Sequence, residues 1–487
     1  MSHVSLKIIG ENPLAITPYE MRYEEDYNGS NPATLTCYSD DDTAGEPWLE
    51  GTALFWQVSH KGNQARQFGG IIQSVTTQTV QQNKENKYFF SIQLANPLAT
   101  EKHTKRSRIW MDKTVLQIIQ TMFANLNLSA NANIDVSTCI NTYPKIDHIV
   151  QYDQSNYSFL QTLCAEYGLT YYITIDNNAD SPTFCINFSD DSTSYSQQTT
   201  SFALPSTQAS NNTTIMHQLS CNSQTVPNMF QTEDYNPLDV SSNLIAKQNG
   251  AKEKDTPIGP ISIFPAGKQT QKHLKQQLTN TVISATQTKK TFYFMTENMQ
   301  CSLGTIADIT KNTQLNQIKL PNTFLPIAIT HSAQDQSNLQ HATKQALALM
   351  HKQTGITRSD FYQNSITAIN YNFQPYLPPL DTKHLAQIPD YFSGIVVGED
   401  FKNQNTSGMQ QHEFKNIYPD AFGRVRVYFP WDSNNPNKDY NLCPQMRVLT
   451  SQNGIAYAPH ANDEVLVAAV NNRSDRFVIM GSAYNSD

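Results

Sequence analysis

The chain has 487 residues and a mass of 54.8 kDa, enough for about three domains that each bury a core. With 34 basic and 42 acidic residues the formal net charge is −8, which excludes a globally basic nucleic-acid-binding protein. Aromatic residues make up 10% of the chain, which excludes a disordered protein, and the sequence contains no run of 18 or more apolar residues to span a membrane.

Seven cysteines are scattered along the sequence, mostly within apolar runs. An odd number of dispersed cysteines favours reduced, buried thiols over a disulfide framework, and no Cys-x-x-Cys pair indicates zinc. The first ten residues lack the basic and apolar regions of a secretory signal. We therefore expect a protein that is made in the cytoplasm without a signal peptide.

The first predicted elements are strands. Thr52–Ser59, Gly70–Val75 and Tyr88–Leu94 are short, rich in β-branched and aromatic residues and separated by polar turns, which is typical of an antiparallel barrel or sandwich. A helix follows, for which Asp112 is the expected N-cap. Its apolar residues recur with helical spacing at Val115, Leu116, Ile119, Met122, Phe123 and Leu126.

A second helix is marked at both ends. Ser155 is a suitable N-cap, and Gly168 supplies a left-handed stop. The strand Leu169–Ile175 follows directly, so we expect the helix to pack on a sheet. The residues that share its buried face are Phe159, Leu160, Leu163 and Tyr167.

Two further regions precede a linker. Asp176–Asn212 is rich in Ser, Thr, Asn and Gln, which predicts surface loops with one strand at Phe184–Phe188. A second β-rich region runs from about Ser220 to Tyr376. Its expected elements are the strands Thr291–Met295, Thr305–Thr310 and Phe324–Thr330 and the helices Lys268–Thr279 and Leu339–His351. Tyr376–Lys383 contains a Pro-Pro pair that resists helix formation, and we predict a linker there.

The last hundred residues carry closely spaced strand signals. Five strands in so short a segment fit a small Greek-key barrel such as an OB-fold. The predicted strands are Tyr391–Val397, Gly423–Phe429, Gln445–Ser451, Glu464–Val470 and Phe477–Ser482.

Several patterns suggest catalysis or metal binding but lack required residues. A Gly-x-Ser-x-Gly motif is absent, and Gly267–Lys268 lacks both the earlier Gly and the following Ser or Thr of a phosphate-binding loop. His412–Glu413 begins like a zinc-protease helix, but Asn416 stands where the second His is needed.

The other candidates have simpler interpretations. His331, His341 and His351 are ten residues apart, so a helix would spread them around its axis. Asp40–Asp42 lacks the spacing and the distal Glu of a calcium loop. We therefore expect no catalytic, cofactor-binding or metal-binding residue, no cofactor, and a protein that is not an enzyme.

Arg424 and Arg426 alternate along a predicted barrel strand near Tyr428 and Trp431. An OB-fold can present such a face to single-stranded nucleic acid. However, residues 386–487 contain eight basic and eleven acidic residues, so counterion release would add little affinity. We interpret the two arginines as structural and expect no nucleic acid as a partner.

The C-terminal segment resembles the OB-fold domain of VgrG, the valine–glycine repeat spike family of type VI secretion systems. The resemblance rests on residues 418–432 (YPDAFGRVRVYFPWD), 446–452 (MRVLTSQ), 462–467 (NDEVLV) and 476–485 (RFVIMGSAYN). Residues 459–462 (PHAN) depart from the family's usual Pro-Arg-Ile-Gly.

Residues 150–168 (VQYDQSNYSFLQTLCAEYG) are similar to a helix motif of the same family. Gln154, Asn156 and Thr162 replace the family's usual Glu, Asp and Arg, which removes an expected salt bridge. Looser similarity covers residues 69–98, 234–244 and 326–332, so the resemblance is ordered along nearly the whole chain.

The resemblance implies a mainly β fold with a few helices, in which a phage-tail-hub-like double β-barrel region precedes a small OB-fold barrel. The expected domains are a first hub barrel (1–104), an inserted α+β hub region (105–215), a second hub barrel region (216–380) and the OB-fold (386–487). Family members continue into a β-helical needle, and we expect none in this chain.

The resemblance also implies a mechanical role. Three chains would cap a six-fold tube of the Hcp type, contact baseplate proteins, carry a tip protein and effectors, and be driven out of the cell through a target membrane. The alternatives are the hub and spike of a phage tail, a pyocin-like particle or an extracellular injection particle. An OB-fold nucleic-acid binder is less favoured because of the charge balance. An enzyme with a lysozyme domain after the barrel is also less favoured, because too few residues follow the barrel to form that domain.

Overall fold

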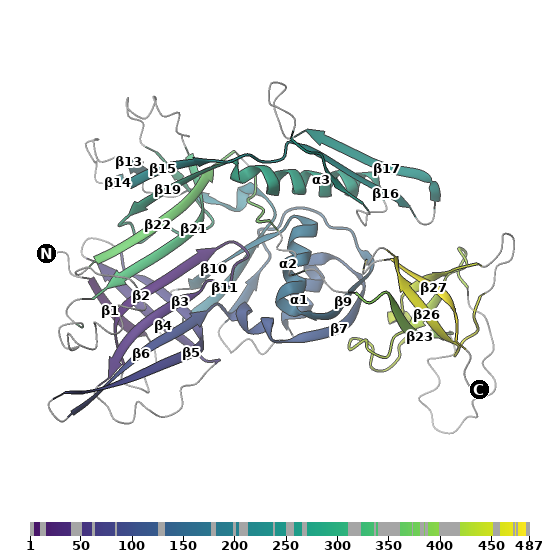
Figure 1. Ribbon diagram of the computed structural model, residues 1–487, viewed down its shortest axis with the longest axis horizontal. Coiled ribbons are helices and arrows are strands. Elements are labelled where there is room, and N and C mark those ends of the chain that lie inside the picture. The colour runs from purple at the N-terminus through teal and green to yellow at the C-terminus, as the bar shows by residue number, and fades with distance from the viewer. Residues whose placement is uncertain are drawn as a thin grey trace.

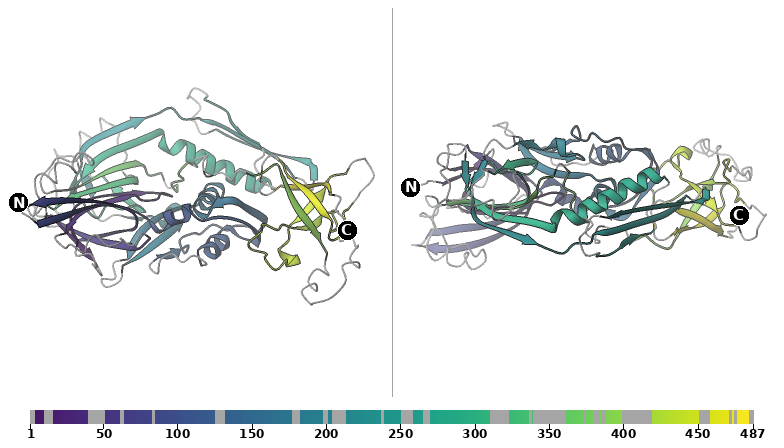
Figure 2. Two further views of the ribbon diagram at one scale, coloured as in Figure 1. Left: turned by 60° about the horizontal axis from the view of Figure 1, so that its bottom comes forward. Right: turned by 90° about the horizontal axis from the view of Figure 1, so that it is seen from above.

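The computed structural model is elongated, with the N-terminal strands near one end and a small barrel at the other (Figures 1 and 2). A mainly β fold with a few helices is confirmed. The structure describes residues 4–9, 16–39, 51–60, 64–82, 85–124, 132–176, 182–197, 201–203, 213–236, 239–249, 258–264, 270–309, 323–335, 338, 361–372, 374–379, 384, 388–398, 419–450, 458–470, 473 and 476–483.

The largest element is a twelve-stranded sheet. Its first six strands, in spatial order, are β1 (Val4–Ile9), β4 (Ala53–His60), β5 (Arg66–Gln82), β6 (Glu85–Ala95), β3 (Ala33–Ser39) and β2 (Thr17–Asp26). The sheet continues through β21 (Thr323–Gln334), β22 (Phe361–Asn370), β19 (Lys290–Thr296) and β15 (His217–Ser223), with β20 (Thr305–Asp308) and β12 (Ser196–Gln197) attached beside β21.

The two halves of this sheet meet at β2 and β21, which pair antiparallel from Glu20 opposite Gln334 to Asp26 opposite Ala328. Strands from the two segments that we predicted as hub barrels therefore hydrogen-bond to each other. The domain boundaries drawn from the sequence stay predictions.

Apolar residues on alternate positions of these strands form two cores. In the first, Trp56 is fully buried and its indole N–H lies 3.0 Å from the Met21 sulfur. The strands predicted near residues 52–94 are confirmed as β4, β5 and β6. The preceding strands β1–β3 were not predicted; in β2 the buried positions include Glu20 and Glu25, which break the apolar alternation.

The region between the two halves folds as a separate α+β layer. It contains β7 (Lys105–Lys113) paired with β9 (Ile146–Ser155), the helices α1 (Val115–Ala124) and α2 (Asn156–Tyr167), and a small sheet of β10 (Thr170–Asp176), β11 (Thr183–Ser189) and β8 (Ala132–Asp135). Both helices bury their apolar faces against this sheet in one core.

The predicted ends of α2 are confirmed. The Ser155 hydroxyl accepts from the Ser158 N–H at 3.1 Å, and Gly168 adopts φ +72°. The predicted cap of α1 is wrong. Thr114 occupies that position: its hydroxyl accepts from the Gln117 N–H, and the Gln117 amide oxygen accepts from the Thr114 N–H at 3.0 Å. This reciprocal capping box satisfies two backbone donors, which Asp112, located within β7, does not.

A third layer covers α2 from the other side (Figures 1 and 2). α3 (Gln271–Thr286) packs on a sheet of β17 (Asp239–Asn249), β16 (Met229–Asn236) and β18 (Ile261–Ile263). α3 confirms the predicted helix near residues 268–279, whereas the predicted helix Leu339–His351 lies outside the described residues. The remaining short elements are β13 (Ser201–Ala203), β14 (Thr213–Ile215) and the 3-10 turns η2 (Pro97–Lys102), η3 (Ser192–Ser194), η4 (Gln287–Lys289) and η7 (Tyr440–Leu442).

The predicted five-stranded barrel is confirmed as a closed sheet. Its strands, in order around the barrel, are β23 (Tyr391–Val397), β24 (Val425–Tyr428), β25 (Gln445–Val448), β27 (Phe477–Ser482) and β26 (Glu464–Ala469). No helix among the described residues is both long and apolar enough to cross a membrane. All seven cysteines are free thiols.

Candidate functional site

The turn before β24 contains the sequence Asp420-Ala-Phe-Gly-Arg424, and its hydrogen bonds explain why Asp, Gly and Arg stand at these positions. One oxygen of the Asp420 carboxylate accepts from the Phe422 N–H at 2.9 Å and the Arg424 N–H at 2.8 Å, and the other accepts from the Arg424 Nε at 2.7 Å. Burial tends to raise the pKa of Asp420, but these hydrogen bonds hold it below its usual value. Gly423 adopts φ +71°, which favours glycine.

The residues after β24 attach the barrel to the inserted region. The Asp432 carboxylate accepts from the Ile109 N–H of β7 at 2.9 Å, and the Asn434 amide donates to the Ile109 carbonyl at 3.0 Å. The Ser433 N–H donates to the Ser107 carbonyl at 3.0 Å. Burial raises the pKa of Asp432 despite the hydrogen bonds that it accepts. The Trp-Asp end of the motif thus holds the barrel against β7.

Apolar packing reinforces this attachment. Ile109 of β7 and Val150 of β9 belong to the same buried core as the barrel interior. Tyr152 of β9 contacts Phe392 and Trp431 of the barrel edge-on, with ring centroids 4.9 and 5.2 Å apart. The barrel is therefore not a loosely tethered domain, because its hydrophobic core continues into the hub.

A second attachment joins the barrel to the outer layer. Arg476, at the start of β27, donates to the Asp234 carboxylate of β16 at 2.6 Å, and both side chains are buried. The same guanidinium lies 4.9 Å from the centre of the Tyr235 ring. Arg473 lies 3.6 Å from Glu166 at the end of α2. The barrel is therefore held on two sides.

His384, directly after the predicted linker, is fixed on α2 by residues that depart from the family motif. The His384 carbonyl accepts from the Gln154 amide at 2.6 Å and from the Thr162 hydroxyl at 3.1 Å, and the Gln154 amide also donates to Thr162 at 3.3 Å. The two positions expected to hold Glu and Arg are thus neighbours in space. Here two neutral side chains replace the ion pair and bind the backbone of His384.

The third departing position, Asn156, is fully buried. Its amide donates to Glu101 at 2.7 Å, and its oxygen accepts from Arg108 at 2.8 Å. Burial, and then the charge of Arg106, lower the pKa of Arg108 to about 10. Asn156 therefore joins two buried groups of opposite charge.

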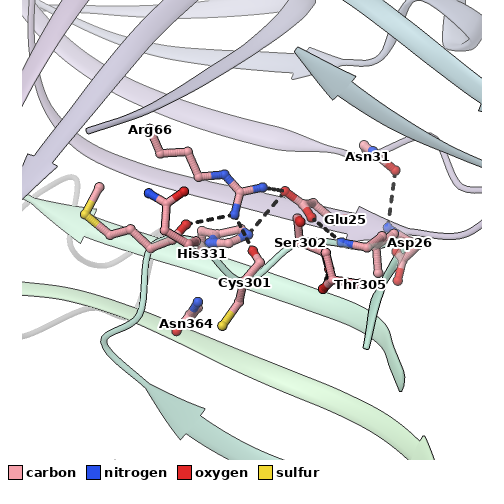
Figure 3. A network of polar contacts seen from close by, with 12 residues as sticks. Glu25, Asp26, Asn31, Arg66, Cys301, Ser302, Thr305, His331 and Asn364 are labelled. Atoms are coloured by element: carbon pink, nitrogen blue, oxygen red, sulfur yellow. Dashed lines mark hydrogen bonds and ion pairs between the residues drawn. The ribbon is translucent and has the colours of Figure 1, made fainter. Parts of the chain in front are cut away.

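A buried polar network connects the two halves of the large sheet (Figure 3). Arg66 of β5 forms an ion pair with Glu25 of β2 and donates to the carbonyls of Met299 and Cys301, which precede β20. His331 of β21 lies 3.3 Å from the same Glu25 carboxylate. These contacts tie β2, β5, β21 and the segment before β20 together.

The electrostatics of this network favour a charged pair with a neutral histidine. Burial tends to raise the pKa of Glu25, but Arg66 and His331 hold it below its usual value. Burial, and then the Arg66 charge, lower the pKa of His331. A neutral ring that faces Glu25 with a protonated Nε2 would accept through Nδ1 from the Tyr362 hydroxyl, which lies 2.7 Å away. The network has the chemistry of a structural junction.

The sequence indicates an ordinary polar position for His331 and gives no signal for Glu25 or Arg66. No local pattern pairs those two residues, because they lie on strands that are separated by β3 and β4 in the sequence. Arg424 and Arg426 are engaged within the barrel: Arg424 also donates to Gln445 at 2.9 Å, and Arg426 donates to the Cys443 carbonyl at 2.8 Å.

The other motifs lie outside the described residues. Among the described part of the chain, no three His, Cys, Asp or Glu side chains gather as a metal site would require. The undescribed motifs are Asp40–Asp42, Gly267–Lys268, His341, His351 and His412–Glu413.

The large sheet, the inserted α+β layer and the attached five-stranded barrel define a tail-hub-type structural protein. The family model for the phage tail baseplate hub (GPD) matches residues 25–337, and the chain belongs to this family. The predicted resemblance to VgrG is also confirmed. A stretch of 74 residues is 36% identical to the type VI secretion system spike protein VgrG3 of Vibrio cholerae serotype O1; it covers 14% of this chain and 7% of that relative.

Solved structures share the fold over nearly the whole chain. One is the Escherichia coli c3393 protein, which is described as a type VI secretion component similar to the T4 bacteriophage tail proteins gp27 and gp5. It is 15% identical, with a TM-score of 0.62, and the match covers 98% of this chain and 100% of that chain. Another is the lidded PdpA–VgrG complex of Francisella, with 12% identity, a TM-score of 0.61 and coverage of 100% and 71%.

Proposed function

We propose that this protein is the structural hub and spike base of a contractile injection machine of the type VI secretion kind. In this proposal three chains cap a six-fold tube of the Hcp type, contact the baseplate and carry a tip protein and effectors through a target membrane. The attachment of the barrel carries the proposal. Asp432–Ile109, Arg476–Asp234 and the shared core make barrel and hub one continuous body, as a part that transmits thrust requires.

An exposed apolar strip on the barrel supports the trimer. Leu449 directly after β25, Met480 of β27 and Leu466 of β26 have exposed fractions of 52, 42 and 43%. The Leu449 N–H donates to the Ile479 carbonyl, and Leu466 lies opposite Gly481, so the three side chains follow one another across the sheet. Large exposed apolar groups in a row are typical of a surface that another protein covers. We assign this strip to contact between barrels.

The family supports a mechanical role without catalysis, and we propose that the chain is not an enzyme. A relative in Francisella is described in complex with PdpA, which supports a partner protein for this chain as well. The seven free thiols fit synthesis in the reducing cytoplasm, from which we propose that the protein leaves only through the contractile machine.

The alternative assignment is the hub of a phage tail or a related contractile particle. The matching family model, which is named for a phage tail baseplate hub, favours it. The two assignments share the trimeric hub and differ in the tube that it caps. Binding to the tube protein encoded beside a secretion sheath, but not to a phage tube protein, would support the secretion machine.

Electron microscopy of the chain mixed with rings of the tube protein tests the proposal. We expect particles with three-fold symmetry on the ends of six-fold rings. The double variant Leu466→Lys/Met480→Lys should abolish the three-fold particles, because two buried charges per chain would lack partners. The matched control Asn437→Lys places a charge on an exposed barrel loop outside the strip and should leave them unchanged. Rings without caps, or caps that survive the double variant, would contradict the proposal.

A further inference from the structure

A cleft of about 670 Å³ separates α3 from the segment that leads into β9. Residues 141–149 form one wall, and Gln276 and Thr279 of α3 form part of the other. The end of α2 and Arg473 of the barrel complete the lining. This volume lies within the range of about 300–1,000 Å³ that is usual for ligand sites. Three parts of the fold therefore share one cleft.

Charged side chains of both signs line the cleft, four acidic and three basic. The buried Asp190 carboxylate accepts from the Asn141 N–H at 3.0 Å and from the Tyr143 hydroxyl at 2.9 Å, and Glu166 lies 3.6 Å from Arg473. The remaining charged residues of the lining are Lys145, Asp147, Asp191 and Lys272, two of each sign. Such a lining does not select phosphate or nucleic acid, for which an excess of basic groups is needed. It suits a neutral polar ligand.

Part of the wall formed by residues 141–149 is the edge of a strand. Ile146–Ile149 of β9 line the cleft, and among the described residues β9 pairs with β7 alone. Residues 142–145, which include Pro144, precede this strand and belong to no sheet. At about 3.3 Å per residue, the four strand residues Ile146–Ile149 span about 13 Å. An exposed edge of extended backbone is a template for one more strand.

We infer that this cleft binds an extended polypeptide segment of a partner protein, which lies along Ile146–Ile149 of β9 as an added strand. Main-chain hydrogen bonds to this edge would supply affinity. The paired rings of Tyr143 and Tyr167, with centroids 6.4 Å apart, and the amide of Gln276 would contact its side chains. The cleft lies within a single chain, so peptide binding does not require the trimer. The inference rests on the proposed function only for the identity of the partner, as cargo or tip protein.

A displayed library of random peptides of about 12 residues is the probe, selected on the full chain. Gln276→Trp fills the cleft, and Thr279→Arg on the same wall is a second blocking variant. Lys275→Trp, on the exposed side of α3 outside the lining, is the matched control. Unchanged thermal midpoints show that each variant folds. Peptide binding and oligomeric state are measured at the same protein concentrations. Loss of the trimer is therefore distinguished from loss of peptide binding at the cleft.

Selected peptides should bind wild type and Lys275→Trp with dissociation constants within about twofold of each other, and bind both blocking variants at least about tenfold more weakly. Bound peptide should slow amide hydrogen exchange at residues 146–149. The inference is overturned if no peptide is enriched, if the blocking variants bind equally well, or if protection appears elsewhere. It is also overturned if an oligosaccharide array, rather than the peptides, gives binding that Gln276→Trp removes.

Discussion

The Asp432 carboxylate of the barrel accepts the backbone N–H of Ile109 in the hub at 2.9 Å, across 323 residues of sequence. Asp432 is 5% exposed, and the same oxygen also accepts from the Asn434 N–H at 3.0 Å. One side chain thus shapes the loop after β24 and fixes it to β7. A buried carboxylate in this role is sensitive to any change that removes its oxygens.

Asp432→Ala should leave the N–H groups of Ile109 and Asn434 without their acceptor, at a cost of about 1–3 kcal/mol in the free energy of unfolding. Amide hydrogen exchange at Ile109 should become faster. Asp439→Ala is the matched control, because the Asp439 carboxylate accepts from the Asn441 N–H within the same turn. If amide hydrogen exchange at Ile109 were as slow in Asp432→Ala as in wild type, the carboxylate would not hold the barrel on the hub.

Arg66→Ala should destabilise the protein by about 3–5 kcal/mol, because it leaves the buried Glu25 carboxylate without its cation. Adding Glu25→Gln should recover part of this loss, since the neutral amide costs less to bury. Arg22→Ala breaks the exposed pair with Glu24 on the same strand and should cost about 0–1 kcal/mol. Urea denaturation measures all four proteins; a double variant no more stable than Arg66→Ala would contradict the buried-charge explanation.

The buried Glu20 carboxyl group should make the stability of the protein depend on pH. Burial raises its pKa to about 7 from the ordinary 4.5. Between these values the folded chain binds more protons than the unfolded chain, so stability is lost as pH rises from about 4.5 to above 7. Relative to Glu20→Gln, wild type should lose on the order of 3 kcal/mol between pH 4.5 and pH 8. Parallel stability curves of the two proteins would contradict this.

Substitutions at Gln154 and Thr162 should compensate for each other in stability. Gln154→Glu alone replaces a donor to the His384 carbonyl with an acceptor and should cost about 1–3 kcal/mol. Gln154→Glu with Thr162→Arg recreates the ion pair of the related motif and should recover part of that stability. A double-mutant cycle on thermal unfolding measures the coupling; additive losses would mean that the two positions do not interact.

Local signals explain what the sequence predicted. Ser155 and Gly168 define α2 through contacts within a few residues, and the barrel strands alternate in apolar character. Thr114 was missed as the cap of α1 because Asp112 is the residue type with the stronger preference, although only Thr114 has Gln117 three residues later.

The junctions could not be predicted because each depends on long-range pairing. The register of β2 on β21 brings Glu25 near His331, and the position of the barrel brings Arg476 to Asp234, 242 residues away. Neither pair has a signature in its own segment. The cleft beside α3 is likewise formed by segments that are distant in the sequence.

The mass of the particle in solution, followed by light scattering over a hundredfold dilution, tests the central claim most directly. We predict a trimer at high concentration, three times the 54.8 kDa of one chain, that dissociates as the protein is diluted. Three chains are expected because a closed three-fold hub can match a six-fold tube. A dimer or a tetramer, or a monomer at every concentration, would contradict the assignment of this chain as a self-assembling hub.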